Sequence, residues 1–210
     1  ICGLVQRGFT GIQRFFGQHF RHPEPGRDQY CSDAPLGAIA YFISGARFCA
    51  MEYPSPLHRV PFLWEVHKVH HSVREMGYAA HLRYHFGETI VYRTIEYLPL
   101  AMIGFGIQDF ILVHLFTILI GHLNHANIYL PLGPLKYIFN NPQMHIWHHV
   151  KDIPKDSYGI NYGISLSLWD YLFGTAWIPS DGRDIKLGFE EVDSYPHGFF
   201  SQMLKPFQRK

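Results

Sequence analysis

The pattern His-x-x-His-His occurs twice in the chain, at residues 67–71 and 145–149. On an α-helix, residues i, i+3 and i+4 lie on one face, so each copy predicts three imidazoles on one helical surface. From 15 histidines in 210 residues, about 0.07 copies are expected by chance, so chance does not explain two. Two such surfaces facing each other offer six nitrogen ligands, enough for a pair of transition metals. The alternative is a His-rich tract with loose metal affinity, but these histidines are spaced and not run together.

Composition narrows the class of protein. A length of 210 residues predicts one domain, and only 17% of the residues are charged, which is low for a soluble globule. The net charge of +1 gives no indication of a nucleic-acid partner. Cys2, Cys31 and Cys49 form no Cys-x-x-Cys pair, so neither a disulfide framework nor a cysteine zinc site is indicated. Residues 1–11 do not have the pattern of a signal peptide.

The helices expected to carry the histidines have recognisable beginnings. Residues 59–76 predict a helix that starts near Pro61, because proline suits the first helical turn. Residues 140–152 predict the second, capped by Asn140 or Asn141 and with Pro142 in the first turn. A further helix is expected over residues 35–51.

Residues 89–122 form the most apolar stretch of the chain. If both His patterns build one site, an even number of membrane crossings must separate them, which favours a hairpin of two short membrane helices turning near residues 104–106. The alternative is the core of a soluble helical bundle. The turn lacks Lys and Arg, and the His side carries many, so the positive-inside rule predicts a site on the cytoplasmic face. The fold class expected is therefore all-α, with membrane helices and a cytoplasmic helical cap that carries a dimetal site.

Other histidines lie near the ends of these predicted helices. His58 and His125 are the stronger candidates for further ligands, and His85 and His122 are balanced between ligand and ordinary polar residue. Metal-bound histidine usually donates its second N–H to a carboxylate or carbonyl, so three carboxylates are candidates to orient the ligands: Glu65, Glu88 and Asp152. Five histidines are not expected to bind metal: His19, His22, His81, His114 and His197.

An ordered series of motifs resembles the fatty acid hydroxylase/sterol desaturase superfamily of membrane di-iron enzymes. The series covers residues 58–178 and includes both His patterns, Arg83-x-His85-x-x-Glu88, His125-Ala-Asn127 and Asn161-Tyr-Gly. The resemblance implies helical spans with a cytoplasmic cap, and oxidation of lipids with O2 and external electrons. It also implies two iron ions, with zinc as a possible substitute, held by His58, His67, His70, His71, His145, His148 and His149, and with His85 and His125 as further candidates. The implied partners are the bilayer, a lipid substrate and an electron donor such as a b-type cytochrome, ferredoxin or reductase.

One position departs from the family pattern. The family begins with His-x-x-x-His, but Pro54 stands where the first histidine is expected, and Tyr53-Pro-Ser-Pro56 predicts a broken helix there. A shift of one nucleotide can restore His-Arg at this point. Residues 1–57 are therefore interpreted as an atypical segment, with a frameshift or truncation as the hypothesis, before a hydroxylase-like domain at 58–178 and a tail at 179–210. Two alternatives to the oxidase follow: a non-catalytic metal-binding membrane protein, inactive through loss of that motif, and a zinc-dependent hydrolase.

Overall fold

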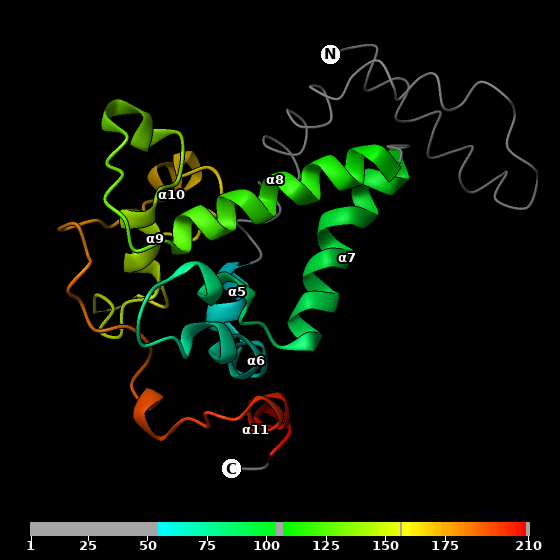
Figure 1. The fold of residues 1–210 in the computed structure, drawn as a ribbon, viewed down its shortest axis with the longest axis vertical. Helices are drawn as coiled ribbons and strands as arrows, with labels where there is room; N and C mark the ends of the chain where they lie inside the picture. Colours follow the sequence, from blue (N-terminus) through cyan, green and yellow to red (C-terminus); the bar gives the residue numbers. More distant parts are fainter. Residues whose placement is uncertain (1–53, 104–106, 156, 209–210) are drawn as a thin grey trace, which may run out of the picture.

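The computed structural model describes residues 54–103, 107–155 and 157–208 (Figure 1). Within these ranges all regular secondary structure is helical. The one β-type pairing in them is an isolated bridge between Val150 and Leu187. The all-α prediction is therefore confirmed for this part of the chain, whereas the helix predicted over 35–51 lies outside it. The elements are α5 (Pro54–Arg59), α6 (Pro61–His71), η2 (Tyr78–Leu82), α7 (Phe86–Ile103), α8 (Ile107–His125), η3 (Gly133–Tyr137), α9 (Pro142–His148), α10 (Leu168–Phe173), η4 (Val192–Ser194), α11 (Phe199–Leu204) and η5 (Lys205–Phe207).

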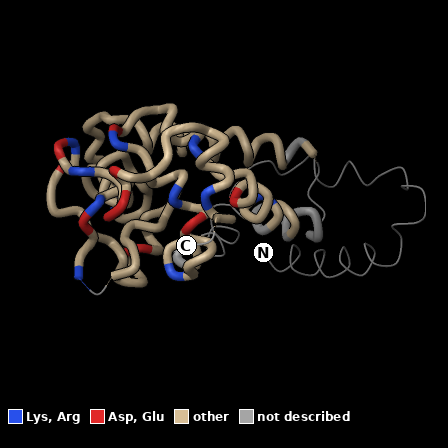
Figure 2. The backbone as a smooth tube through the Cα atoms, turned by 90° about the horizontal axis from the view of Figure 1, so that it is seen from below, with Lys and Arg blue, Asp and Glu red and all other residues tan. Residues whose placement is uncertain are grey.

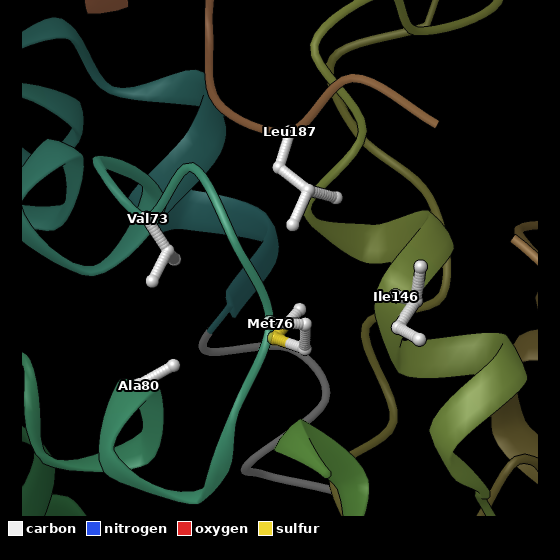
Figure 3. Packing of buried hydrophobic residues seen from close by; sticks show 5 residues of the cluster. All are labelled: Val73, Met76, Ala80, Ile146 and Leu187. Carbon is white, nitrogen blue, oxygen red and sulfur yellow. The ribbon is translucent and has the colours of Figure 1, made fainter. Parts of the chain in front are cut away.

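Helix α6 begins as predicted, with Pro61 in its first turn, but it ends at His71 and not near residue 76. The cause is packing of the residues that follow. Val73 and Met76 leave the helical path and join a buried apolar cluster with Ala80, Ile146 and Leu187 (Figure 3). Because Ile146 lies on α9, this cluster fixes the end of the first His helix against the second.

Helix α9 also begins as predicted. The Asn141 side chain accepts a hydrogen bond from the backbone N–H of Met144 at 2.9 Å, and Pro142 follows in the first turn. The helix ends at His148, earlier than the predicted residue 152, because the Lys151 N–H turns to donate to the carbonyl of Lys186. His149 is the C-cap residue, so it still lies at the end of the helical surface.

The apolar stretch forms two helices, α7 and α8, on either side of residues 104–106, which lie outside the described ranges. The two helices diverge from the segment that joins them (Figure 1). An exposed apolar row at spacing four runs along α8: Ile107, Ile111, Leu115 and Leu119. Charged residues concentrate at the end of the molecule away from where α7 and α8 meet (Figure 2). No helix in the described ranges is both long and apolar enough to cross a bilayer, so the predicted membrane hairpin is not confirmed.

The position of Pro54 is compatible with helix. Helix α5 places Pro54 and Pro56 in its first turn and carries His58 in its last turn. Proline is tolerated in a first turn because the N–H groups there have no partner within the helix. Residues Pro54–Arg59 are therefore helical despite the two prolines, and a break before Pro54 falls outside the described residues.

Candidate metal centre

Eight histidines from four helices gather into two groups of four. The first group contains His58, His67, His71 and His148, and the second contains His70, His125, His145 and His149. Within each group the ligand nitrogens lie within 4.8 Å of one another. The two groups adjoin, because the ring centroids of His71 and His149 are 4.4 Å apart. The structure thus brings together eight of the nine histidines that the sequence indicates.

Each His-x-x-His-His copy contributes to both groups. His67 and His71 of α6 enter the first group, whereas His70 enters the second. The second copy divides the opposite way: His145 and His149 enter the second group, whereas His148 enters the first. The reason is helical geometry: residues i and i+4 differ by about 40° around the axis, but i+3 and i+4 differ by about 100°. The prediction of one shared face was therefore too coarse to show this division.

Backbone carbonyls fix the orientation of three rings. The Nδ1–H of His70 donates to the carbonyl of Arg83 at 3.1 Å, and that of His125 donates to Gly121 at 2.7 Å. The Nδ1–H of His148 donates to the carbonyl of Ile160 at 2.8 Å. A carbonyl can only accept, so Nδ1 must carry the proton in all three neutral rings. Each Nε2 therefore presents a lone pair.

These lone pairs point at other ring nitrogens. The Nε2 atoms of His70 and His125 are 3.2 Å apart, although neither carries a proton when the rings are neutral. Two facing lone pairs at this distance need a cation between them. Four nitrogens held tetrahedrally at about 2.1 Å from one ion lie about 3.4 Å apart, close to the separation observed. The arrangement therefore fits a metal ion.

A proton does not fill this role, because the rings are buried. Burial lowers the pKa of His148 to about 4. It also lowers the pKa well below the ordinary histidine value in five other rings: His58, His70, His71, His145 and His149. The Nε2 of His58 is buried without a hydrogen-bond partner among the described residues, as expected for a ligand atom. The donor set is all imidazole, which suits iron, zinc, copper and nickel.

Of the three carboxylates predicted to orient ligands, one contacts a ligand. The Nδ1–H of His67 donates to Glu88 Oε1 at 2.9 Å, and the side chains are only 6% and 4% exposed. Glu65 instead accepts from Lys68 at 2.8 Å, and Asp152 is exposed. Glu88 is therefore the carboxylate that completes a carboxylate–histidine pair at the first group.

His85 lies outside both groups although it is fully buried. Its Nε2–H donates to the carbonyl of Met203 at 2.9 Å, and its Nδ1 accepts from the N–H of Gly87. Both ring nitrogens are thus used to tie the start of α7 to α11. His122 also lies outside both groups, with its Nδ1–H donating to the carbonyl of Tyr78.

A turn near α10 sets the position of the Ile160 carbonyl. The fully buried Asp170 carboxylate accepts from the N–H groups of Tyr162 and Gly163 and from the Thr175 hydroxyl. Asn161 adopts a left-handed φ of 52° and donates to the carbonyl of Met144 on α9. Asparagine tolerates this conformation better than most residues do. These bonds hold the 160–163 segment beside His148.

One cavity of about 80 Å³ borders both groups. Its wall includes His67 and His148 from the first group and His70, His125 and His145 from the second. Most of the area of the remaining wall is apolar, but its residues are mixed: Leu57, His81, Tyr84, Glu88, Thr89, Tyr92, Arg93, Thr117, Tyr162 and Ile164. Sequence reasoning did not identify the apolar residues of this wall or the three carbonyls that orient His70, His125 and His148. Neither the wall residues nor the carbonyls have a distinctive sequence pattern.

The sequence model of the fatty acid hydroxylase family matches residues 55–175, which include all eight grouped histidines. Ornithine lipid hydroxylase OlsE of Rhizobium tropici is 34% identical over 148 residues, covering 70% of this chain and 44% of that protein. Human alkylglycerol monooxygenase is 35% identical over 146 residues, covering 68% of this chain and 31% of that protein.

The chain thus spans less than half the length of these relatives. No solved structure matches. The family match covers more than half of the chain and coincides with the two histidine groups. The chain therefore belongs to the fatty acid hydroxylase family.

Proposed function

We propose that this chain forms the metal-binding part of a lipid hydroxylase that uses O2 and external electrons. The observation that carries the proposal is the pair of all-histidine groups that border one cavity. In the overall reaction, a C–H bond, O2, two electrons and two protons give a C–OH group and water. Relatives named as a hydroxylase and a monooxygenase favour hydroxylation over desaturation.

The groups would hold two iron ions. The first ion would bind His58, His67, His71 and His148, and the second would bind His70, His125, His145 and His149. Bound iron supplies the activation of O2 that amino-acid side chains cannot provide. The first group already has four imidazoles without a histidine at position 54, so the chain does not need that residue to complete it. This favours an active centre over the inactive metal-binding alternative.

The protein's own residues hold and enclose the site. Carbonyls and Glu88 keep the Nε2 atoms free to bind metal, because they take up the Nδ1 protons. The mainly apolar cavity wall would place a hydrocarbon segment beside both groups and exclude water. The exposed apolar row of α8 would lie against lipid. The electron donor would be a b-type cytochrome, a ferredoxin or a reductase. The cytoplasmic orientation remains a prediction from the Lys and Arg distribution.

The test combines metal analysis with turnover. Purified chain, loaded with iron under reducing conditions, is expected to hold two ions and to convert a lipid to its hydroxylated product with O2 and a chemical reductant. His148→Ala is expected to lose product and one metal equivalent, whereas His122→Ala, outside both groups, should retain both ions. Zinc in place of iron with hydrolysed lipid and no O2 uptake would instead establish the hydrolase alternative.

The reading of residues 1–57 has a separate test. The interpretation as a frameshifted segment predicts a His-Arg pair at positions 54–55 when the underlying nucleotides are read in the shifted frame. A shifted frame without that pair contradicts the interpretation.

A further inference from the structure

A second cavity, of about 280 Å³, lies between the segment after α6, the segment before α7, η4 and α11. Arg83 connects this cavity with the metal centre. Its backbone carbonyl accepts the Nδ1–H of His70, whereas its side chain lines the cavity. This cavity contains none of the grouped histidines, so the proposed hydroxylation does not account for the polar side chains that line it.

The Arg83 guanidinium lacks a counter-ion among the described residues. Its Nη2 donates to the Ser72 hydroxyl at 2.7 Å and makes a long contact of 3.4 Å with the Gln202 side-chain oxygen. Its Nε is buried without a hydrogen-bond partner, and no carboxylate of the described ranges pairs with it. The residue is half-buried, so its charge is only partly solvated, and an anion bound here would supply the missing counter-ion.

Tyr195 supplies a second unused donor in the same wall. Its side chain lines the cavity, the residue is only 6% exposed, and its hydroxyl is buried without a partner in the described structure. Burial raises the pKa of Tyr195 to about 12, so the hydroxyl stays protonated and able to donate at neutral pH. The side chains that line this cavity therefore include two that each carry a donor atom without an acceptor in the described structure, the Nε of Arg83 and the hydroxyl of Tyr195.

The remaining wall is also suited to an anion. Arg74 adds a second guanidinium, which also lies 3.8 Å from the Asp193 carboxylate, and Glu75 is the single carboxylate among the described residues that line the cavity. Glu75 is exposed, so its charge is largely screened by solvent. Guanidinium groups match the oxygen geometry of phosphate through paired N–H donors.

We propose that this cavity is a binding site for a phosphate group, with Arg83 and Tyr195 as its donors. The site is independent of the proposed hydroxylase activity. Phosphate can reach it either as the free ion or as a lipid headgroup. The lipid source deserves its own experimental arm because α11, which supplies Gln202 to the cavity, exposes Phe199, Phe200 and Leu204 on its outer side.

The test measures binding of inorganic phosphate to the purified full chain by calorimetry, against chloride at matched ionic strength. Saturable binding is expected. Arg83→Gln should weaken it by about tenfold or more, and Tyr195→Phe by about threefold. The matched control is Arg183→Gln, which removes an arginine paired with Asp181 outside this cavity and should leave phosphate affinity unchanged. Tyr195→Phe removes a hydroxyl that makes no bond within the described fold, so it tests the site even if Arg83→Gln does not fold.

A second arm uses short-chain phosphatidic acid below its micelle concentration. Tighter binding than inorganic phosphate, with the same sensitivity to Arg83→Gln, identifies a lipid headgroup as the source. Equal affinity for the two ligands identifies the phosphate group alone as what is recognised. Absence of saturable binding of both ligands overturns the proposal, and so does binding that Arg83→Gln and Tyr195→Phe leave unchanged.

Discussion

The bond between His67 and Glu88 provides a quantitative test of the metal centre. Replacing Glu88 by Gln keeps the size of the side chain but removes the negative charge that accepts the Nδ1–H of His67 at 2.9 Å. Both side chains are almost completely buried, so solvent does not weaken this pair appreciably. Changes in residues that orient metal-bound histidines typically reduce metal affinity by about 10- to 100-fold, or about 1.4 to 2.7 kcal/mol. We expect Glu88→Gln to fall in this range for one of two ions.

The assay is competition for metal against a chelator of known affinity, with the number of ions per chain counted at each step. The larger weakening should fall on one equivalent, because Glu88 contacts a ligand of the first group only. Glu190→Gln, which changes an exposed carboxylate, serves as the control and should bind both ions normally. Two ions bound by Glu88→Gln with unchanged affinity would refute the assignment of Glu88 as an orienting residue.

Three further predictions concern single residues. Because burial lowers the pKa of His148 to about 4 from an ordinary 6.5, its neutral form stabilises the metal-free fold above pH 6.5. Up to about 3 kcal/mol of that stability should disappear between pH 6.5 and 4 in chemical unfolding of the metal-free chain, and His148→Gln should remove this contribution while those of the other buried histidines remain. His85→Ala should retain two ions per chain but lower the free energy of unfolding by about 1 to 3 kcal/mol; loss of an ion would instead make His85 a ligand. Gly121→Ala should destabilise the fold by about 1 to 3 kcal/mol, since the new Cβ would lie 2.1 Å from His81 Cε1, and adding His81→Ala should recover most of the loss. If the double variant is no more stable than Gly121→Ala alone, His81 is not the cause.

Local sequence patterns predicted the beginnings of the two His helices, because Pro61, Asn141 and Pro142 act within one turn of themselves. The helix ends were predicted too late, because Val73 and Lys151 find partners far away in the chain, and no local signal describes such partners. The presence of three imidazoles on each His helix could be predicted from spacing alone. Their division between two groups could not, since it depends on how α6 and α9 face each other.

The further histidines show the same limit. His58, His85 and His125 all stand beside predicted helices in the sequence, but only the fold separates them. His58 and His125 turn toward the two groups, whereas both nitrogens of His85 are engaged by Gly87 and Met203. The orienting carbonyls of Arg83, Gly121 and Ile160 have no sequence signature at all, because every residue has a carbonyl.

Because α6 and α9 each contribute histidines to both groups, binding of a metal ion to one group affects binding to the other. Each helix supplies ligands to both groups, so an ion in one group fixes the helices that carry the ligands of the other. Binding of the first ion thereby removes part of the ordering cost for the second, which is positive cooperativity. At limiting metal, singly loaded chains should be fewer than independent binding at the two groups would give. Scarcity of metal would then lower the number of complete centres and leave each complete centre unchanged.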